Sequence, residues 1–264
     1  MQSLLDRRLP LRTRLDLLAA ELRRKVARRS LYPVRYGRGT VYLSNDDFVV
    51  DRKSFDFAVV EETYATGYDG AVVVDIGAHK GYFAAYAVTR GAHVVVAYEP
   101  ESANLAVLER TAAAYPQVEW AVRRAAVDAT AGRSALHVMG ASWGHALAPP
   151  AAFAQYEVGT QEVEVVALAD ALDEAASLWA GRRVVVKVNI EGAECSAILG
   201  SPHLAWEGVD EVFVETHPWA TCDASELAAH LELAGFSREA SAHPAVLRMR
   251  RGESPRSGRR SGPR

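Results

Sequence analysis

The chain has 264 residues, 49% of them hydrophobic and 24% charged, which is typical of a globular protein with one large domain or two small ones. No apolar run approaches the roughly 20 residues of a transmembrane helix, and the Arg-rich residues 1–30 lack the apolar stretch of a secretory signal. The net charge of −3 conceals a body, residues 31–247, with 14 basic and 29 acidic residues, which disfavours a nucleic-acid partner and suits a cationic ligand.

Residues 1–54 are expected to form an N-terminal extension. Leucines with arginines between them recur at helical spacing within residues 11–29, which predicts an amphipathic helix; they are Leu11, Leu15, Leu18 and Leu22. The helix can cap the domain, pack on a second copy in a homo-oligomer, or lie on a membrane surface. The lack of aromatic anchors favours the first two. Residues 40–43 and 48–51, joined by Ser-Asn-Asp-Asp, predict a β-hairpin.

The main domain is expected over residues 55–250, and its first residues, 55–66, have a helical pattern. Strands and helices then alternate, which predicts parallel strands joined by right-handed crossovers. Strands are predicted at 72–75, 94–98, 118–122, 184–188 and 211–214, and helices at 81–90, 101–115 and 223–235. Further β-prone segments are 134–139 and 161–166, with a closing hairpin at 236–240 and 246–250.

Two other segments have distinctive compositions. The Gly/Ala/Pro-rich residues 140–152 predict a loop near the mouth of a site, where Trp143 and His145 can help to recognise a substrate. The Gly/Ser/Pro/Arg-rich tail, residues 251–264, is expected to be disordered. Cys195 and Cys222 lack metal-site or redox spacing, so a reduced, cytoplasmic setting is expected.

The segment Val73–Phe83, V-V-D-I-G-A-H-K-G-Y-F, predicts a buried strand, a tight glycine turn and a helix. Gly77 and Gly81 suit a backbone that approaches a ligand or adopts positive φ. In open α/β sheets, ligands bind at this edge of the sheet. Asp75 ends the strand, where its carboxylate is expected to meet a bound cofactor.

Glu99 ends the next strand, in A-Y-E-P, where an acid commonly accepts hydrogen bonds from ribose hydroxyls. It could instead cap the helix that follows. The glycine pattern is G-x-x-x-G, not the G-x-G-x-x-G of a dinucleotide site. An acid beside the first glycine suits an amino group and a sulfonium better than a pyrophosphate, which favours S-adenosylmethionine over NAD.

Polar side chains also follow the fourth and fifth core strands, in K-V-N-I-E-G-A-E and E-T-H-P. Neighbouring strands lie roughly 5 Å apart, so these side chains can converge beside the cofactor; they are Asn189, Glu191, Glu215 and His217. Glu194 can stabilise a helix start. Lys187 is expected to form a salt bridge with Glu215 or Glu191.

These segments resemble those of the FkbM-type class I methyltransferases, over about residues 60–236. The resemblance implies a Rossmann-like α/β fold with a mostly parallel seven-stranded sheet, extended here by the N-terminal helix and a small β addition. It implies S-adenosylmethionine as cofactor, bound by the turn and by the acid after the second strand. The corresponding residues here are Asp75, Gly77, Ala78, His79, Gly81, Tyr82, Phe83, Glu99, Pro100 and, near the adenine, Asp128. Asn189 departs from the family's usual Asp, and His79 from a frequent Asn.

Methyl transfer to a hydroxyl requires positioning and proton removal, and two mechanisms fit. In the preferred one, His217 is the general base, oriented by Glu191 or Glu215. In the other, Mg²⁺ is held by Glu191, Glu215 or His217 with Asn189; the loss of a charge at Asn189 weakens this version.

The function expected is O-methylation of a small molecule, a sugar or a secondary metabolite in natural product biosynthesis. An RNA-directed methyltransferase, whose basic ends would clamp RNA, is the alternative enzyme. A non-catalytic module that binds S-adenosylmethionine is the alternative outside catalysis.

Overall fold

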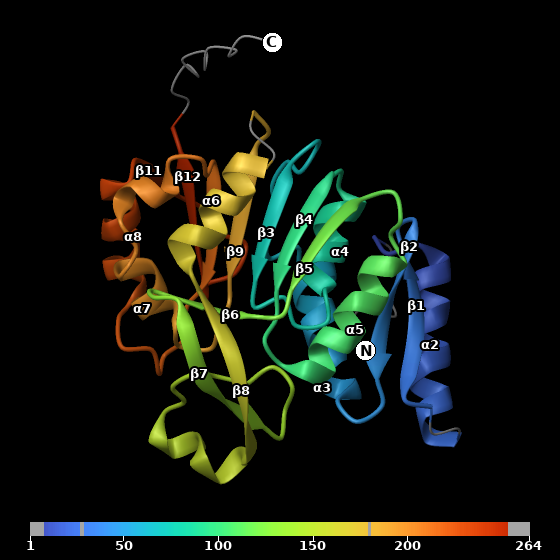
Figure 1. Cartoon of the computed structure of the whole chain (residues 1–264). Helices are drawn as coiled ribbons and strands as arrows, with labels where there is room; N and C mark the ends of the chain where they lie inside the picture. Colours follow the sequence, from blue (N-terminus) through green and yellow to red (C-terminus); the bar gives the residue numbers. More distant parts are fainter. Residues whose placement is uncertain (1–7, 27–28, 179–180, 253–264) are drawn as a thin grey trace.

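The computed structural model describes residues 8–26, 29–178 and 181–252, and its centre is a seven-stranded sheet in the order β11-β12-β10-β9-β3-β4-β5 (Figure 1). The parallel strands are β3 (Val72–Ile76), β4 (Val94–Tyr98), β5 (Glu119–Arg123), β9 (Val184–Val188) and β10 (Glu211–Glu215). The last two strands, β11 (Phe236–Glu239) and β12 (Val246–Arg251), form an antiparallel hairpin beside β10. The predicted sheet and closing hairpin are confirmed.

The central strands are apolar because both of their faces are covered. Alternate residues of β3 enter different cores: Val73 packs into one, and Val72 and Val74 into the other. The first core contains residues of α4 (Tyr82–Thr89) and α5 (Ser102–Ala113). The second contains residues of α6 (Leu168–Leu178), α7 (Glu194–Leu199), η3 (His203–Trp206) and α8 (Ala224–Leu233).

A second, three-stranded sheet extends past the carboxyl edge of the first one (Figure 1). It consists of β6 (Ala126–Asp128), β8 (Glu157–Ala167) and β7 (Gly132–Met139), with the short helix η2 (Ala151–Tyr156) before β8. The predicted β-prone segments 134–139 and 161–166 lie in β7 and β8. The predicted loop occupies residues 140–150.

The N-terminal extension contains α2 (Leu11–Val26), β1 (Leu31–Tyr36), β2 (Gly39–Ser44), α3 (Phe48–Phe55) and the π-helical turn η1 (Asp56–Val60). The predicted hairpin of residues 40–43 with 48–51 is wrong, because β2 pairs with β1 instead. The second of those segments is helical, and it buries Phe48, Asp51 and Phe55 at helical spacing. The helix predicted over 55–66 ends at Val60.

Cys195 and Cys222 form a disulfide, so the expectation of two reduced cysteines is wrong. The bond ties α7 to the loop that follows β10. Apart from Arg251 and Gly252, the tail predicted to be disordered lies outside the described residues. Within those residues, none of the helices combines the length and the apolar character that spanning a bilayer requires.

Candidate active site

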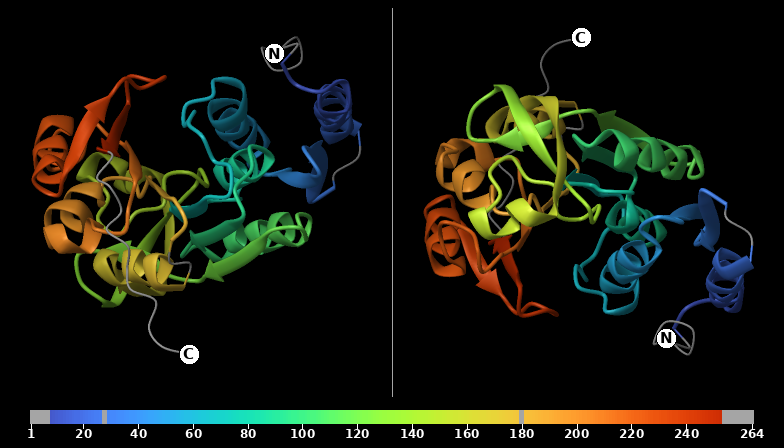
Figure 2. Two further views of the ribbon diagram at one scale, coloured as in Figure 1. Left: turned by 90° about the horizontal axis from the view of Figure 1, so that it is seen from above. Right: turned by 90° about the horizontal axis from the view of Figure 1, so that it is seen from below.

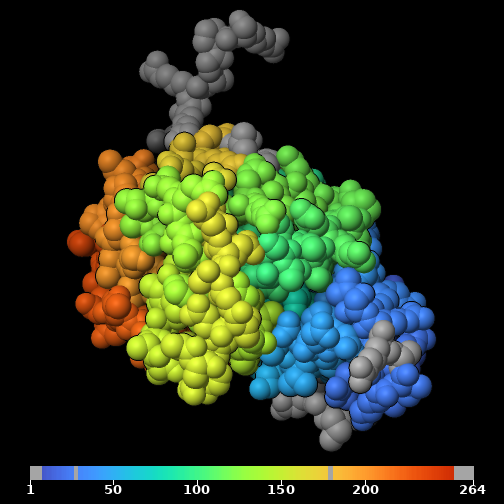
Figure 3. All heavy atoms as spheres, turned by 60° about the horizontal axis from the view of Figure 1, so that its bottom comes forward, coloured from blue at the N-terminus to red at the C-terminus, as the bar shows by residue number. Residues whose placement is uncertain are grey.

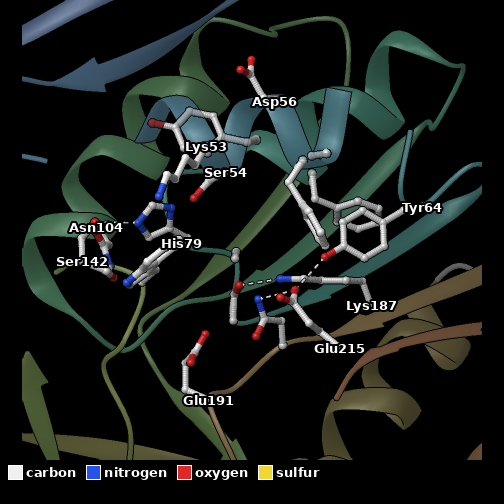
Figure 4. Close-up of a pocket in the computed structure, with 18 of the residues that line it drawn as sticks. Lys53, Ser54, Asp56, Tyr64, His79, Asn104, Ser142, Lys187, Glu191 and Glu215 are labelled. Atoms are coloured by element: carbon white, nitrogen blue, oxygen red, sulfur yellow. Dashed lines mark hydrogen bonds between the residues drawn. The ribbon is translucent and has the colours of Figure 1, made fainter. Parts of the chain in front are cut away.

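A cavity of 540 Å³ opens at the carboxyl ends of β3 and β9. The chain runs outward from β3 to β4 and β5, and later returns to place β9 and β10 on the other side of β3. Ligands bind in open α/β sheets at such a reversal of strand order. Figure 4 shows the side chains around the cavity, with Glu191 below, His79 and Asn104 on one side and Glu215 on the other.

The turn after β3 depends on glycine for steric reasons. Gly77 has a φ of +74°, and a Cβ atom there would lie 1.8 Å from the backbone oxygen of Asn189. Gly81 has a φ of +86° at the start of α4. Positive φ was expected at both, but the close approach at Gly77 is to the protein's own backbone.

Glu99 is held by the same turn. Its carboxylate is buried and accepts hydrogen bonds from the backbone N–H of His79 at 2.7 Å and of Glu101 at 2.9 Å. Burial raises the pKa of Glu99 to about 8, although these two N–H groups act in the opposite direction. Each oxygen keeps a lone pair for another donor, and Glu99 lines the cavity, as a ribose-binding acid requires.

Asp75 does not line the cavity. It is fully buried, and its Oδ1 lies 3.1 Å from Nζ of Lys187, which also donates to the backbone oxygen of Gly77 at 2.7 Å. Burial raises the pKa of Asp75, while the ion pair with Lys187 opposes the rise. The predicted partners of Lys187, Glu215 and Glu191, were therefore wrong: the lysine fixes the strand β3 and its turn.

The other predicted cofactor residues are divided between several places. Ala78, His79, Tyr82 and Phe83 line the cavity. Pro100 lines a neighbouring apolar cavity of 50 Å³, which shares Gly77 and His145 with the first. Asp128 lines neither and accepts a hydrogen bond from the Ser196 hydroxyl at 2.6 Å.

The segment after β9 holds Glu191 in the cavity by a strained turn. Glu191 has a φ of +55°, which is unfavourable for a residue with a side chain. The buried Glu194 carboxylate accepts hydrogen bonds from the backbone N–H groups of Ile190 and Gly192, both at 2.8 Å. Glu194 therefore does more than stabilise a helix start, because it fixes the turn that carries Glu191.

His217 lies behind this turn. Its Nε2 is 3.5 Å from a Glu191 carboxylate oxygen, its Nδ1 is 3.1 Å from one of Glu194, and its ring packs on Trp219 with centroids 4.7 Å apart. Burial alone would lower the pKa of His217, but the two adjacent carboxylates of Glu191 and Glu194 outweigh it and raise the pKa to about 10. The pKa of Glu191 is raised by burial, and the contact with His217 opposes the rise. His217 is thus an imidazolium at neutral pH.

Asn189 and Glu215 form a second pair. The Asn189 amide donates to Glu215 at 2.8 Å, and the Tyr64 hydroxyl donates to the same carboxylate oxygen at 3.1 Å. Of the four residues predicted to converge after β9 and β10, Asn189, Glu191 and Glu215 line the cavity, whereas His217 does not. In the chain as far as the structure describes it, no group of three or more His, Cys, Asp and Glu side chains is arranged to hold a metal ion.

Sequence reasoning missed one wall of the cavity. This wall consists of residues from α3, η1 and the segment that follows, among them Lys53, Ser54, Asp56, Phe57 and Tyr64 (Figure 4). The Lys53 ammonium lies 5.6 Å from the ring centre of Trp143, and both residues line the cavity. The predicted place of Trp143 and His145 at the site is confirmed. The π-helical turn η1 is a feature that often occurs at functional sites, but no local sequence motif predicts a π-helical turn.

Sequence reasoning also missed Lys80. Its buried ammonium lies 2.6 Å from Asp51 of α3, 2.9 Å from the Ser44 hydroxyl and 3.2 Å from the Ser142 hydroxyl. Ser142 Oγ in turn lies 3.0 Å from Nε2 of His79. The His79 side chain, at a position where the family frequently has Asn, therefore contacts the loop 140–150. Its backbone N–H makes the expected contact as well, to Glu99.

These residues fit S-adenosylmethionine. Glu99 presents a fixed carboxylate for ribose hydroxyls, and the turn at Gly77–His79 forms the adjoining wall. The neighbouring apolar cavity, lined by Pro100 and Ile190, offers a surface for a flat ring.

Comparisons with known proteins place the chain in a family. The profile of the methyltransferase FkbM domain matches residues 75–243, more than half of the chain. None of the curated proteins matches it.

Two solved structures illustrate more distant similarity. Magnesium protoporphyrin IX methyltransferase from Synechocystis PCC 6803 with bound SAM is 12% identical, with 78% of this chain and 82% of that chain covered and a TM-score of 0.41. A putative RNA methyltransferase from Pyrococcus horikoshii is 11% identical, with coverage of 91% and 99% and a TM-score of 0.41. The family match decides the identity: the chain belongs to the FkbM methyltransferase family and is an S-adenosylmethionine-dependent methyltransferase.

Proposed function

We propose that the enzyme methylates a hydroxyl oxygen of a small polyhydroxylated molecule, a sugar or a secondary metabolite of natural product biosynthesis. The cavity volume of 540 Å³ is typical of a small-molecule site. Glu191, Glu215 and Asn189 offer hydrogen-bonding groups to several hydroxyls, and Phe57 and Tyr64 add aromatic surface. This combination supports a sugar-like acceptor better than an extended RNA strand.

S-adenosylmethionine, when bound, supplies an electrophilic methyl group on a sulfonium. The acceptor oxygen forms the new bond to the methyl carbon as the bond from carbon to sulfur breaks, and the hydroxyl proton must leave. The protein's task is therefore to orient the hydroxyl and to accept its proton.

Glu191 is the group that we assign to proton acceptance, and its position in the cavity carries the proposal. Its carboxylate faces the cavity from a turn fixed by Glu194, and the His217 imidazolium lies 3.5 Å behind it. Burial raises the pKa of Glu191 toward the range in which a carboxylate is an effective base. His217, already protonated at neutral pH because its pKa is raised to about 10, serves to position Glu191.

Glu215 and Asn189 are assigned to orientation of the acceptor. Glu215 is fixed by hydrogen bonds from Tyr64 and Asn189, and both Glu215 and Asn189 line the cavity. A second hydroxyl of a sugar can donate to Glu215 while the reacting hydroxyl faces Glu191. Orientation by two carboxylates favours acceptors with neighbouring hydroxyls.

The test is a methylation assay with isotopically labelled S-adenosylmethionine and a metabolite extract, followed by mass spectrometry of the labelled products. We expect the label on an oxygen of a hydroxylated small molecule. Glu191→Gln should lose about 100-fold or more in kcat, because the amide cannot accept the proton. Its affinity for S-adenosylmethionine, measured by calorimetry, should stay close to that of the wild type.

Glu239→Gln, on the exposed edge strand β11, is the matched control and should retain full turnover. Label transferred only to RNA would contradict the proposal, and cofactor binding without transfer to any acceptor would indicate a binding module. Chelation tests the metal mechanism. If turnover is lost on chelation and recovers with Mg²⁺, a metal ion activates the acceptor hydroxyl and the role assigned to Glu191 is wrong.

A further inference from the structure

The helix α2 exposes its leucines to solvent. The stripe consists of five large apolar side chains that are 42% to 89% exposed: Leu11, Leu15, Leu18, Leu22 and Val26. They are spaced at three or four residues and so follow one face of the helix. A continuous stripe of this kind marks an interaction surface more strongly than scattered exposed residues do.

The opposite face of α2 fixes this orientation. Leu17 and Ala20 are buried in the first core, and the buried Thr13 hydroxyl donates to the backbone oxygen of Arg35 at 2.7 Å. Asp16 forms a bidentate pair with the Arg35 guanidinium at 2.7 and 2.9 Å. The helix is thereby attached to β1, and its leucine stripe faces away from the domain that it caps.

The surroundings of the stripe are cationic. The helix carries five basic residues, Arg12, Arg14, Arg23, Arg24 and Lys25, against two acids. Both acids are already paired within the chain, Asp16 with Arg35 and Glu21 with Arg24. The ribbon views of Figure 2 place α2 at the outer edge of the molecule, and the N-terminal segment is likewise at the edge in Figure 3. The acidic protein body therefore carries a basic, apolar helix at its edge.

We propose that α2 binds an anionic lipid surface, with the leucines at the boundary of the acyl chains and the basic side chains among lipid phosphates. Leucine provides the apolar face of such interfacial helices even without aromatic residues. Each nearby Lys or Arg adds electrostatic attraction to an anionic leaflet. A second copy of the chain fits less well, because pairing two α2 helices would bring two basic surfaces together.

The test is co-sedimentation of the full chain with vesicles of phosphatidylcholine alone or mixed with phosphatidylglycerol. We expect binding to the mixed vesicles, weakening as salt is added, and at least about tenfold weaker binding to phosphatidylcholine alone. The triple variant Leu15→Ser/Leu18→Ser/Leu22→Ser should lose more than about tenfold in affinity. Arg23→Gln/Lys25→Gln should lose about tenfold or more by removing two charges.

The matched control is Leu204→Ser/Leu233→Ser, which removes two leucines, each 75% exposed, outside α2. This control should bind vesicles like the wild type. Circular dichroism establishes that each variant is folded. No binding to mixed vesicles, or binding that the triple variant retains, would overturn the proposal. Concentration-dependent dimerisation that the triple variant abolishes, seen by analytical ultracentrifugation in the absence of lipid binding, would identify a second copy as the occupant instead.

Discussion

The ammonium of Lys80 lies 2.6 Å from the carboxylate of Asp51, and both side chains are buried. The ion pair joins the turn after β3, on the cofactor side, to α3, which forms the opposite wall of the cavity. The same ammonium lies 3.2 Å from the Ser142 hydroxyl of the loop 140–150. Three segments that enclose the cavity therefore meet at one buried charge.

Lys80→Met should destabilise the protein by about 3–5 kcal/mol, because it leaves a buried carboxylate without its cation. Burial already raises the pKa of Asp51, and the ion pair with Lys80 is what opposes this rise. The free energy of unfolding in urea measures the effect. The double variant Lys80→Met/Asp51→Asn removes both charges and should recover much of the loss; equal instability of the two variants would show that the ion pair is not the cause.

Gly77→Ala should cost more than about 2 kcal/mol of stability and weaken S-adenosylmethionine binding. The added Cβ would overlap the Asn189 backbone oxygen, at a φ of +74°. Gly132→Ala is the matched control, since no heavy atom lies within 4 Å of a Cβ placed there. Thermal unfolding compares the two variants, and similar shifts for both would refute the steric argument.

Glu99→Gln should weaken S-adenosylmethionine binding about 10- to 100-fold by removing a charged hydrogen-bond acceptor. Because burial raises the pKa of Glu99 to about 8, the ionised fraction in the free enzyme grows between pH 7 and 9. Wild-type affinity should therefore rise by up to about tenfold over that interval. Calorimetry at several pH values measures this, and a rise of the same size in the Gln variant would exclude Glu99 as its source.

His217 should make stability depend on alkaline pH. Its folded-state pKa is raised to about 10, above the usual 6.5, so its stabilising contribution is complete below about pH 6.5 and is lost as pH rises toward 10. The loss should be at most about 5 kcal/mol. Urea titrations from pH 6 to 10 should show a smaller decline in His217→Gln, whereas parallel curves would mean that the imidazolium does not stabilise the fold.

Removal of the disulfide should destabilise the protein by about 3–4 kcal/mol, the value expected for a cross-link between positions 27 residues apart. Cys222→Ser gives the same measurement without a reducing agent. The loop with His217 and Trp219 precedes Cys222, so turnover should fall as well. A titration that finds two free thiols in the unreduced, denatured protein would show that the bond is not formed.

The core of the fold was predictable because it depends on local pattern. Unbroken valine runs indicated β3, β4 and β9, and the acids and glycines after them indicated the edge of the sheet that forms the site. The convergence of Glu191, Glu215 and His217 then followed from the spacing of parallel strands.

The remainder depends on contacts that no local pattern encodes. Phe48–Asp51 is β-prone by composition, yet it is helical because Phe48, Asp51 and Phe55 are buried on one helical face. Lys187 pairs with Asp75 because the strands that carry them are adjacent in the sheet. The exposure of the α2 leucines could not be predicted either, because helical spacing does not show which face of a helix packs against the rest of the protein.

The wall built by residues 53–64 lies before residue 75, where the family match begins. Part of the cavity wall therefore lies outside the matched domain, whereas the residues that we propose to contact the acceptor, Asn189, Glu191 and Glu215, lie inside it. Exchanging only residues 53–64 would replace this wall and would leave Glu99, Glu191 and the pair of Asp51 with Lys80 in place. Recombination at this boundary offers a direct way to diversify acceptors without rebuilding the donor site.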